Sequence, residues 1–121
     1  MRYVLLIYQN EAEHAQLSQA ELGAESGAYK ALTEEFQHRG LLLSTEAIQP
    51  IHTATTVRVQ GGKPVITDGP FAETKEHLRG YVLLNCQDLD EALALAPKIP
   101  AARYGSIEIR PVMELNWGRS R

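Results

Sequence analysis

Cysteine, long apolar runs and clustered basic residues are all scarce in this 121-residue sequence. The lone cysteine, Cys86, cannot form an intramolecular disulfide, which favours a reducing, cytoplasmic setting. No apolar run approaches the ~20 residues that a membrane span requires, and we expect neither a signal peptide nor a membrane partner. The formal net charge of −3 argues against direct nucleic-acid binding, which needs clustered Lys and Arg.

Motifs for metals and nucleotides are absent as well. The four histidines are scattered, no His-x-x-x-His or Cys-x-x-Cys spacing occurs, and there is neither a Gly-x-Gly-x-x-Gly run nor a P-loop. We therefore expect no metal and no cofactor. What the chain does have is a composition near the globular average, with 44% hydrophobic and 22% charged residues. This predicts one folded domain over residues 1–115, with 116–121 as a C-terminal tail.

Apolar periodicity divides the chain into strands and helices. In chain order we predict a strand (1–7), a helix (24–39), a strand (41–48), a hairpin (55–60 with 64–67), a strand (80–86), a helix (89–96) and a final strand (106–115). Ser18 and Glu21 have the spacing of a capping box, but Gly23 and Gly27 weaken the next turn, so the first helix is placed near Ala24. This order is typical of an α+β, ferredoxin-like split βαβ fold with an inserted β-hairpin, an antiparallel sheet and both helices on one face.

The two strands expected at the centre of that sheet are apolar on both faces. In residues 3–8 and again in 81–86, apolar side chains fall on both parities of the strand, whereas a sheet with one wet face should alternate. Two helices can cover only one face. An uncovered apolar face usually marks an interface, and the simplest partner is a second copy of the chain. We therefore expect a homodimer joined through its sheet faces as a dimeric α/β barrel.

The outer strands place charge where the two sheets would meet. If their apolar parity, which includes Val57 and Val59, packs on the helices, then Arg58, Glu108 and Arg110 face the space between the sheets. A part-polar cleft at a subunit interface suits a small, anionic organic ligand. The alternative is that these are solvated positions on edge strands.

A charged turn, VITDGPFAETKE at residues 65–76, holds the main catalytic candidate. Asp68 can cap this turn through its carboxylate while Phe71 anchors the turn in the core, which is a purely structural role. A carboxylate beside an interface cleft can instead act as a general base, with His14 or His52 as its partner. Both roles stay open for Asp68.

Three further side chains are candidates for ligand contact beside Arg58 and Arg110. Glu73 and Lys75 follow the charged turn, and their alternative is a solvated, mutually paired surface. Arg103 lies in the segment PAARYG and could bind an anion; its alternative is a simple connector.

Four segments, in the same order and over nearly the whole chain, resemble the YCII-related proteins of the DGPF type: ATTVR (54–58), VITDGPFAETKE (65–76), LDEALALA (89–96) and IPAARYGSIEIRPV (99–112). The resemblance implies a ferredoxin-like dimeric α/β barrel, a bacterial setting, and genes beside or fused to those of extracytoplasmic-function sigma factors. The wider group is associated with a His–Asp pair suspected of catalysis. Asp68 matches the family block, whereas no histidine of this chain lies in a matching motif.

The resemblance does not imply one established activity. The fold of the family is similar to that of muconolactone isomerases, which is only an analogy for function. We expect a homodimer that binds a small, anionic ligand between the sheets, with isomerase- or lyase-like acid–base chemistry at Asp68. The alternative is a non-catalytic ligand-sensing or regulatory module that works with a sigma factor. A bare dimerisation unit would instead show a dry, filled space between the sheets.

Overall fold

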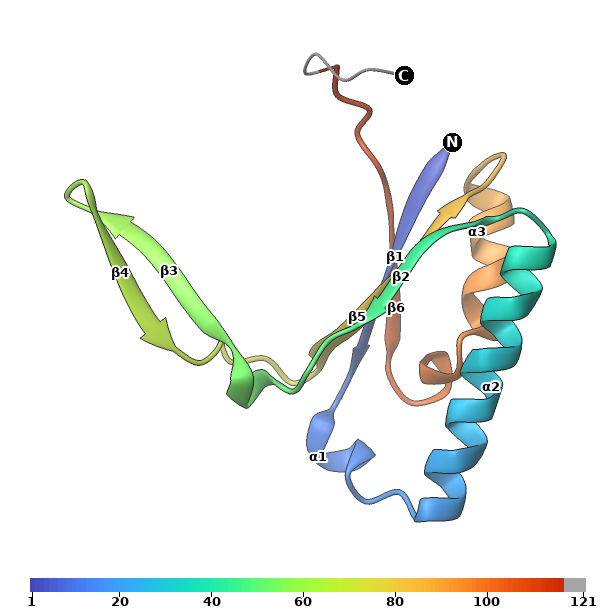
Figure 1. Cartoon of the computed structure of the whole chain (residues 1–121), viewed down its shortest axis with the longest axis horizontal. Helices are drawn as coiled ribbons and strands as arrows, with labels where there is room; N and C mark the ends of the chain where they lie inside the picture. The colour runs from blue at the N-terminus through green and yellow to red at the C-terminus, as the bar shows by residue number, and fades with distance from the viewer. Residues whose placement is uncertain (117–121) are drawn as a thin grey trace.

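Four strands form one antiparallel sheet in the computed structural model, which describes residues 1–116 (Figure 1). They lie side by side in the order β2, β5, β1 and β6, which span Leu42–Ala47, His77–Asn85, Arg2–Gln9 and Ser106–Pro111. Two helices, α2 (Gln19–His38) and α3 (Leu89–Leu95), lie on one side of this sheet. The prediction of an α+β chain with an antiparallel sheet is confirmed, and the sheet is not closed into a barrel.

Helix α2 begins earlier than predicted because its capping box forms. The Ser18 hydroxyl accepts a hydrogen bond from the amide of Glu21 at 3.1 Å, and the Glu21 carboxylate accepts one from the amide of Ser18 at 2.9 Å. Placing the start near Ala24 was wrong. Two satisfied amides offset the cost of about 1 kcal/mol that each glycine adds to a helix.

Helix α3 is short and passes into two 3-10 turns. Asp88 caps it by accepting the amide hydrogen of Glu91 at 2.9 Å. The turns η2 (Ala96–Lys98) and η3 (Pro100–Arg103) follow, and each has a proline in its first two positions. A further short helix that the sequence did not predict, α1 (Glu11–His14), follows β1.

The core lies between the sheet and the two helices. Along β1, buried and half-buried side chains alternate over the whole strand, so one parity packs on the helices and the other lies on the open side. Phe36 of α2, Leu84 of β5 and Ile99 between the two 3-10 turns are almost fully buried in this core. Cys86 is buried there too, and burial raises the pKa of its thiol, which fits a packing role.

The predicted hairpin forms, but it stands apart from the main sheet. Strands β3 (Thr55–Gln60) and β4 (Lys63–Asp68) make a separate two-stranded sheet. Gly61 and Gly62 connect them with φ of +57° and +78°, a conformation that favours glycine. Figure 1 shows the hairpin extending away from the body, on the side of the main sheet opposite α2 and α3.

This position corrects the expectation for the hairpin side chains. Val57 and Val59 were expected to pack on the helices, but they are 59% and 71% exposed. Arg58 belongs to the hairpin and not to the sheet that carries Glu108 and Arg110, so the three do not line one strand face. The reason is that a hairpin inserted between two strands need not join their sheet. The alternation of apolar and polar residues along the hairpin strands does not show whether it does.

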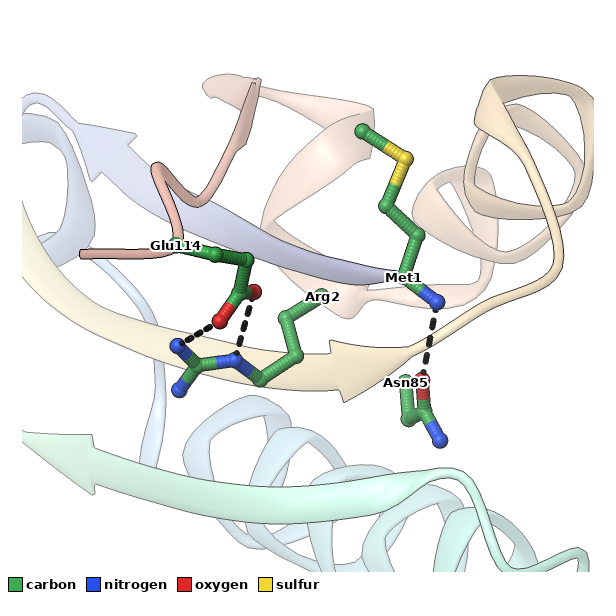
Figure 2. Close-up of polar contacts among 4 residues, drawn as sticks. All are labelled: Met1, Arg2, Asn85 and Glu114. Carbon is green, nitrogen blue, oxygen red and sulfur yellow. Dashed lines mark hydrogen bonds and ion pairs between the residues drawn. The ribbon is translucent and has the colours of Figure 1, made fainter. Parts of the chain in front are cut away.

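Polar contacts tie the two ends of the described chain to the central strands. Strand β6 ends at Pro111, before the predicted end at 115. Beyond it, Glu114 accepts two hydrogen bonds from the Arg2 guanidinium, at 2.7 and 3.0 Å (Figure 2). The amino group of Met1 donates to the side chain of Asn85 at 3.1 Å. These contacts bring the segment after β6 back to the start of β1.

The tail predicted for 116–121 lies, apart from its first residue, outside the described residues. The division into a domain over 1–115 and a tail therefore stays a prediction. Among the described residues, no helix combines the length and the apolar character that crossing a membrane requires.

The contact between β2 and β5 makes a direct prediction for Gly80. A Cβ at this position would lie 2.4 Å from the carbonyl oxygen of Glu46 and 3.1 Å from the Cα of Ala47, both in the backbone of β2. Because backbone cannot move aside easily, Gly80→Ala should lower the free energy of unfolding by about 1–3 kcal/mol in urea titrations. Gly27→Ala is the control: its site in α2 is open, and the change should raise stability by about 0.5–1 kcal/mol. Wild-type stability in Gly80→Ala would contradict this packing.

Candidate functional site

A pocket of about 330 Å³ lies between α2 and the helix-facing side of the sheet. Its walls are mainly apolar and come from α2, β1, β2, β5 and the segment between the two 3-10 turns; they include Leu22, Leu32, Phe36, Leu42, Val82 and Ile99. Small-molecule sites are typically concave, apolar and at least about 300 Å³, with a few polar groups that orient the ligand. This pocket is at the small end of that range.

Small side chains leave the space that the pocket occupies. Ser26 of α2, Ala47 of β2 and Gly80 of β5 all line it. Near the carboxyl end of α2, Phe36 is 1% exposed and fills the interface with the sheet, whereas Leu22, near the other end, is 38% exposed. The helix is therefore packed tightly at one end and stands off from the sheet at the other.

A bulge in β5 directs a charged residue to this pocket. In the β1–β5 ladder, Ile7 pairs with Gly80 and Tyr8 pairs with Leu78, so Arg79 has no partner on β1. A β-bulge of this kind re-aims a side chain relative to regular alternation. Arg79 lines the apolar pocket as a result.

Four polar side chains, which we call the Glu25 cluster, meet beside the pocket: His14, Glu25, Arg79 and Tyr104. They come from α1, α2, β5 and the end of η3. Nε2 of His14 lies 2.8 Å from a Glu25 carboxylate oxygen, and the other oxygen accepts the Tyr104 hydroxyl. Nη1 of Arg79 lies 3.4 Å from Nδ1 of His14. An Nε2–H donating to Glu25, with Nδ1 accepting from Arg79, satisfies both ring nitrogens.

The electrostatics of the cluster keep Glu25 ionised. Burial acts to raise the pKa of Glu25, but hydrogen bonds from Tyr104 and His14, together with the charge of Arg79, lower it overall. Burial and the hydrogen bond to Glu25 raise the pKa of Tyr104, so its hydroxyl keeps its proton and serves as a donor. The cluster therefore holds the ionised Glu25 carboxylate and the Arg79 guanidinium in fixed positions.

Two buried donors in the pocket lining have no hydrogen-bond partner among the described residues: Nε2 of Gln9 and Nε of Arg79. Gln9 is only 3% exposed and continues the helix-facing parity of β1. A buried donor left without an acceptor costs about 1–3 kcal/mol. These two N–H groups can therefore serve a hydrogen-bond acceptor that enters the pocket. Within residues 1–116, no group of three or more His, Cys, Asp and Glu side chains could hold a metal ion.

The structure places Asp68 away from this pocket. Asp68 is exposed at the end of β4 and does not line it. The turn after it is held by Gly69, whose amide donates to Ala54 at 2.7 Å and whose carbonyl accepts the Thr56 hydroxyl at 2.7 Å. Phe71 is 77% exposed, so the expectation that it anchors the turn in the core was wrong. The hairpin carries the turn away from the core that Phe71 was expected to reach.

The histidines proposed as partners of Asp68 have other positions. His14 contacts Glu25 and Arg79 through its two ring nitrogens and not Asp68 of the same chain, so its pairing with Asp68 stays a prediction. His52 is exposed in the short 3-10 turn η1 (Ile51–Thr53), just before the hairpin. A catalytic role for Asp68 itself stays a prediction.

The remaining predicted contacts are spread over the surface. Glu73 and Lys75 are exposed in a segment that is neither helix nor strand, although the carbonyl of Lys75 accepts a hydrogen bond from the Asn10 side chain at 2.9 Å. Arg103 is exposed at the end of η3, and Arg110 is exposed on β6. The structure brings none of these four predicted residues into the lining of the pocket between α2 and the sheet.

The residues that the sequence analysis missed are Gln9, Glu25 and Arg79. One signal was available: Gln9 is a polar residue on the parity of β1 that is otherwise apolar. No spacing connects residues 14, 25, 79 and 104, and the bulge that redirects Arg79 has no sequence mark. Tertiary folding alone assembles the cluster.

The pKa of Glu25 generates a test of the cluster. Folding lowers this pKa below its ordinary value of 4.5, so ionised Glu25 stabilises the fold above that pH, and the contribution is lost as pH falls through the folded value. Glu25→Gln should cost about 1–3 kcal/mol of unfolding free energy at neutral pH, and the difference from wild type should shrink in acid. Glu34→Gln, an exposed change on the same helix, should stay within about 0.5 kcal/mol throughout. A difference for Glu25→Gln that does not vary with pH would contradict the assignment.

Comparison with known proteins places the chain in a family. The family model for the YCII-related domain matches residues 1–116. An uncharacterised protein of Rhizobium meliloti (strain 1021) is 35% identical over 114 residues, which cover 93% of this chain and 92% of that protein. A family match over nearly the whole chain, together with this level of identity, shows that the chain belongs to the YCII-related family.

Proposed function

We propose that this chain is a homodimer that binds a small organic ligand in the pocket between α2 and the sheet. The observation that carries this proposal is the combination of an apolar cavity with two buried, unpartnered N–H donors in its lining. Natural proteins rarely keep such donors buried without an acceptor. The pocket replaces the cleft between two sheets as the proposed ligand site, because it exists within one protomer.

Binding is better supported than chemistry. Glu25 has a lowered pKa and already accepts hydrogen bonds from His14 and Tyr104, so it is a weak proton acceptor. Isomerase- or lyase-like chemistry with Asp68 as the base is a further proposal. It requires that Asp68 be shielded from water, and a partner copy packed at the hairpin would shield it.

The dimer is proposed from the open side of the sheet, where one apolar face remains. Its side chains belong to the half-buried parity of the central strands: Val4, Leu6, Tyr8, Tyr81 and Leu83. A second copy packed on this face would produce the dimeric α/β barrel of a ferredoxin-like fold. Polar groups would border the seam, since the Tyr8 hydroxyl donates to Glu108 at 3.2 Å on the neighbouring strand.

The hairpin supports the same assembly. Register pairs Val57 with Ile66 and Val59 with Pro64, which puts all four side chains on one face of the hairpin. This face is open to water, and Ile66 on it is 67% exposed. An isolated two-stranded hairpin is only marginally stable in water. The hairpin extends on the same side as the open sheet face (Figure 1), so a partner docked on that face could also contact the hairpin.

A regulatory role beside an extracytoplasmic-function sigma factor is the alternative that the family resemblance suggests. In that case ligand binding would change the contact between this chain and the sigma factor, and the ligand would not be converted to a product. Co-purification of the native chain with such a factor, dependent on ligand, would favour this alternative over an enzyme.

Leu6→Glu tests the dimer. Leu6 lies mid-strand on the open face, paired with Tyr81 on one side and Glu108 on the other, and a carboxylate there would be buried without a partner. We expect the variant to fold but to dissociate at least about tenfold more readily, as measured by size exclusion with light scattering. Leu93→Glu, on exposed α3, is the matched control and should leave the assembly unchanged. Equal masses for Leu6→Glu and wild type would contradict this interface.

Ser26→Phe tests the pocket. Ser26 is an exposed residue of α2 that lines the cavity, so a phenyl group there should occupy the space without disrupting the core. In a fragment screen with ligand-observed NMR, wild-type binders should lose at least about tenfold in affinity. Ala31→Phe, on the same helix outside the lining, should bind as wild type does. Asp68→Asn should also bind normally; loss of binding only in that variant would move the site to the hairpin.

A further inference from the structure

The two unpartnered donors point to a class of ligand for the proposed pocket. Gln9 and Arg79 both line the cavity, and neither Nε2 of Gln9 nor Nε of Arg79 has an acceptor among the described residues. They come from the two central strands, where Gln9 of β1 pairs with His77 of β5, two residues before Arg79. Two residues that lie close together on neighbouring strands therefore each bring an unpartnered donor to the wall of one cavity.

The positive charge of Arg79 narrows the class of ligand that the pocket would bind. No described carboxylate lies within ion-pair distance of its guanidinium. Glu25, the acidic member of the cluster, is linked to Arg79 through His14. The other acidic residue of the lining, Glu46, is exposed on β2. A half-buried guanidinium without a carboxylate at contact distance favours an anionic acceptor over a neutral one.

The size and lining of the cavity define the rest of the ligand. An apolar cavity of about 150 Å³ holds benzene, so about 330 Å³ has room for roughly ten to twelve non-hydrogen atoms. The remaining walls are mainly aliphatic and aromatic, and they include Leu32 and Phe36. The body of the ligand should therefore be apolar and compact, with its polar group at one end.

We propose that the pocket takes a small apolar monocarboxylate, with one carboxylate oxygen on Arg79 Nε–H and the other on Gln9 Nε2–H. This rests on the proposed binding pocket and adds its ligand class. Planar guanidinium and amide donors suit the two oxygens of a carboxylate, and each such bond is charge-assisted. Arg79 thereby gains a direct ion-pair partner, which no described residue provides, and Gln9 gains an acceptor.

The experiment compares acids with their methyl esters. Benzoate, phenylacetate and cinnamate, each beside its methyl ester, are titrated into the full chain by calorimetry. For wild type, each acid that binds should do so at least about tenfold more tightly than its ester. Arg79→Met should remove most of that preference, and Gln9→Met should weaken acid binding several-fold with little effect on the esters. Arg39→Met is the matched control, because Arg39 ends α2 outside the lining and pairs with Glu35.

The outcomes separate this inference from the pocket proposal. Esters that bind as well as acids, or an acid preference that survives Arg79→Met, overturn the carboxylate assignment and leave the pocket standing. Failure of every acid and ester, with wild-type folding confirmed, overturns both. Should Arg79→Met fail to fold, Arg79→Lys keeps the charge but loses the Nε–H at its position, and the acid preference should still fall.

Discussion

The structure depends on one imbalance: a four-stranded sheet that is apolar on both faces has helices on only one of them. On the covered face, Leu5 and Leu84 are fully buried against α2 and α3, which stabilises the protomer. On the other face, Leu6 and Leu83 remain half-exposed. Removing an apolar face from water is favourable by about 25 cal/mol per Å². This uncovered face is the strongest physical support for the proposed dimer, and the hairpin on the same side would provide a second surface for it.

The covered face carries the candidate site, and a single strand serves both packing and binding. In β5, Gly80 allows β2 to approach closely, while the bulge at the preceding Arg79 directs a guanidinium to the cavity. Arg79 then reaches His14, and through it Glu25 and Tyr104. Gly80 permits close packing, and the neighbouring Arg79 brings a guanidinium to a cavity whose walls are mainly apolar.

How far the sequence predicts this arrangement depends on the range of the interactions. The strands, the hairpin turn at Gly61–Gly62 and the two helices follow from local periodicity and turn chemistry, and they were predicted correctly apart from their ends. The start of α2 was misplaced because two glycines were given more weight than the capping box at Ser18. The direction of the hairpin could not be predicted, since the alternation of Val57 and Val59 is the same wherever the hairpin points.

The candidate site was the least predictable part. The charged turn around Asp68 attracted attention because its residues are close in sequence, yet it lies outside the pocket. The cluster that does border the pocket joins residues far apart in the chain, through a bulge and two short helical segments. His14 was a candidate from the sequence, but as a partner of Asp68. Gln9, polar on an otherwise apolar parity, carried a signal that was missed.

The most direct measurement of the central claim is an isotope-filtered NOE experiment on an equal mixture of labelled and unlabelled wild-type chains. The account predicts intermolecular NOEs to the methyl groups of Val4, Leu6 and Leu83 on the open face. It would be contradicted by a folded 13.4 kDa monomer at micromolar concentration that shows no such NOEs.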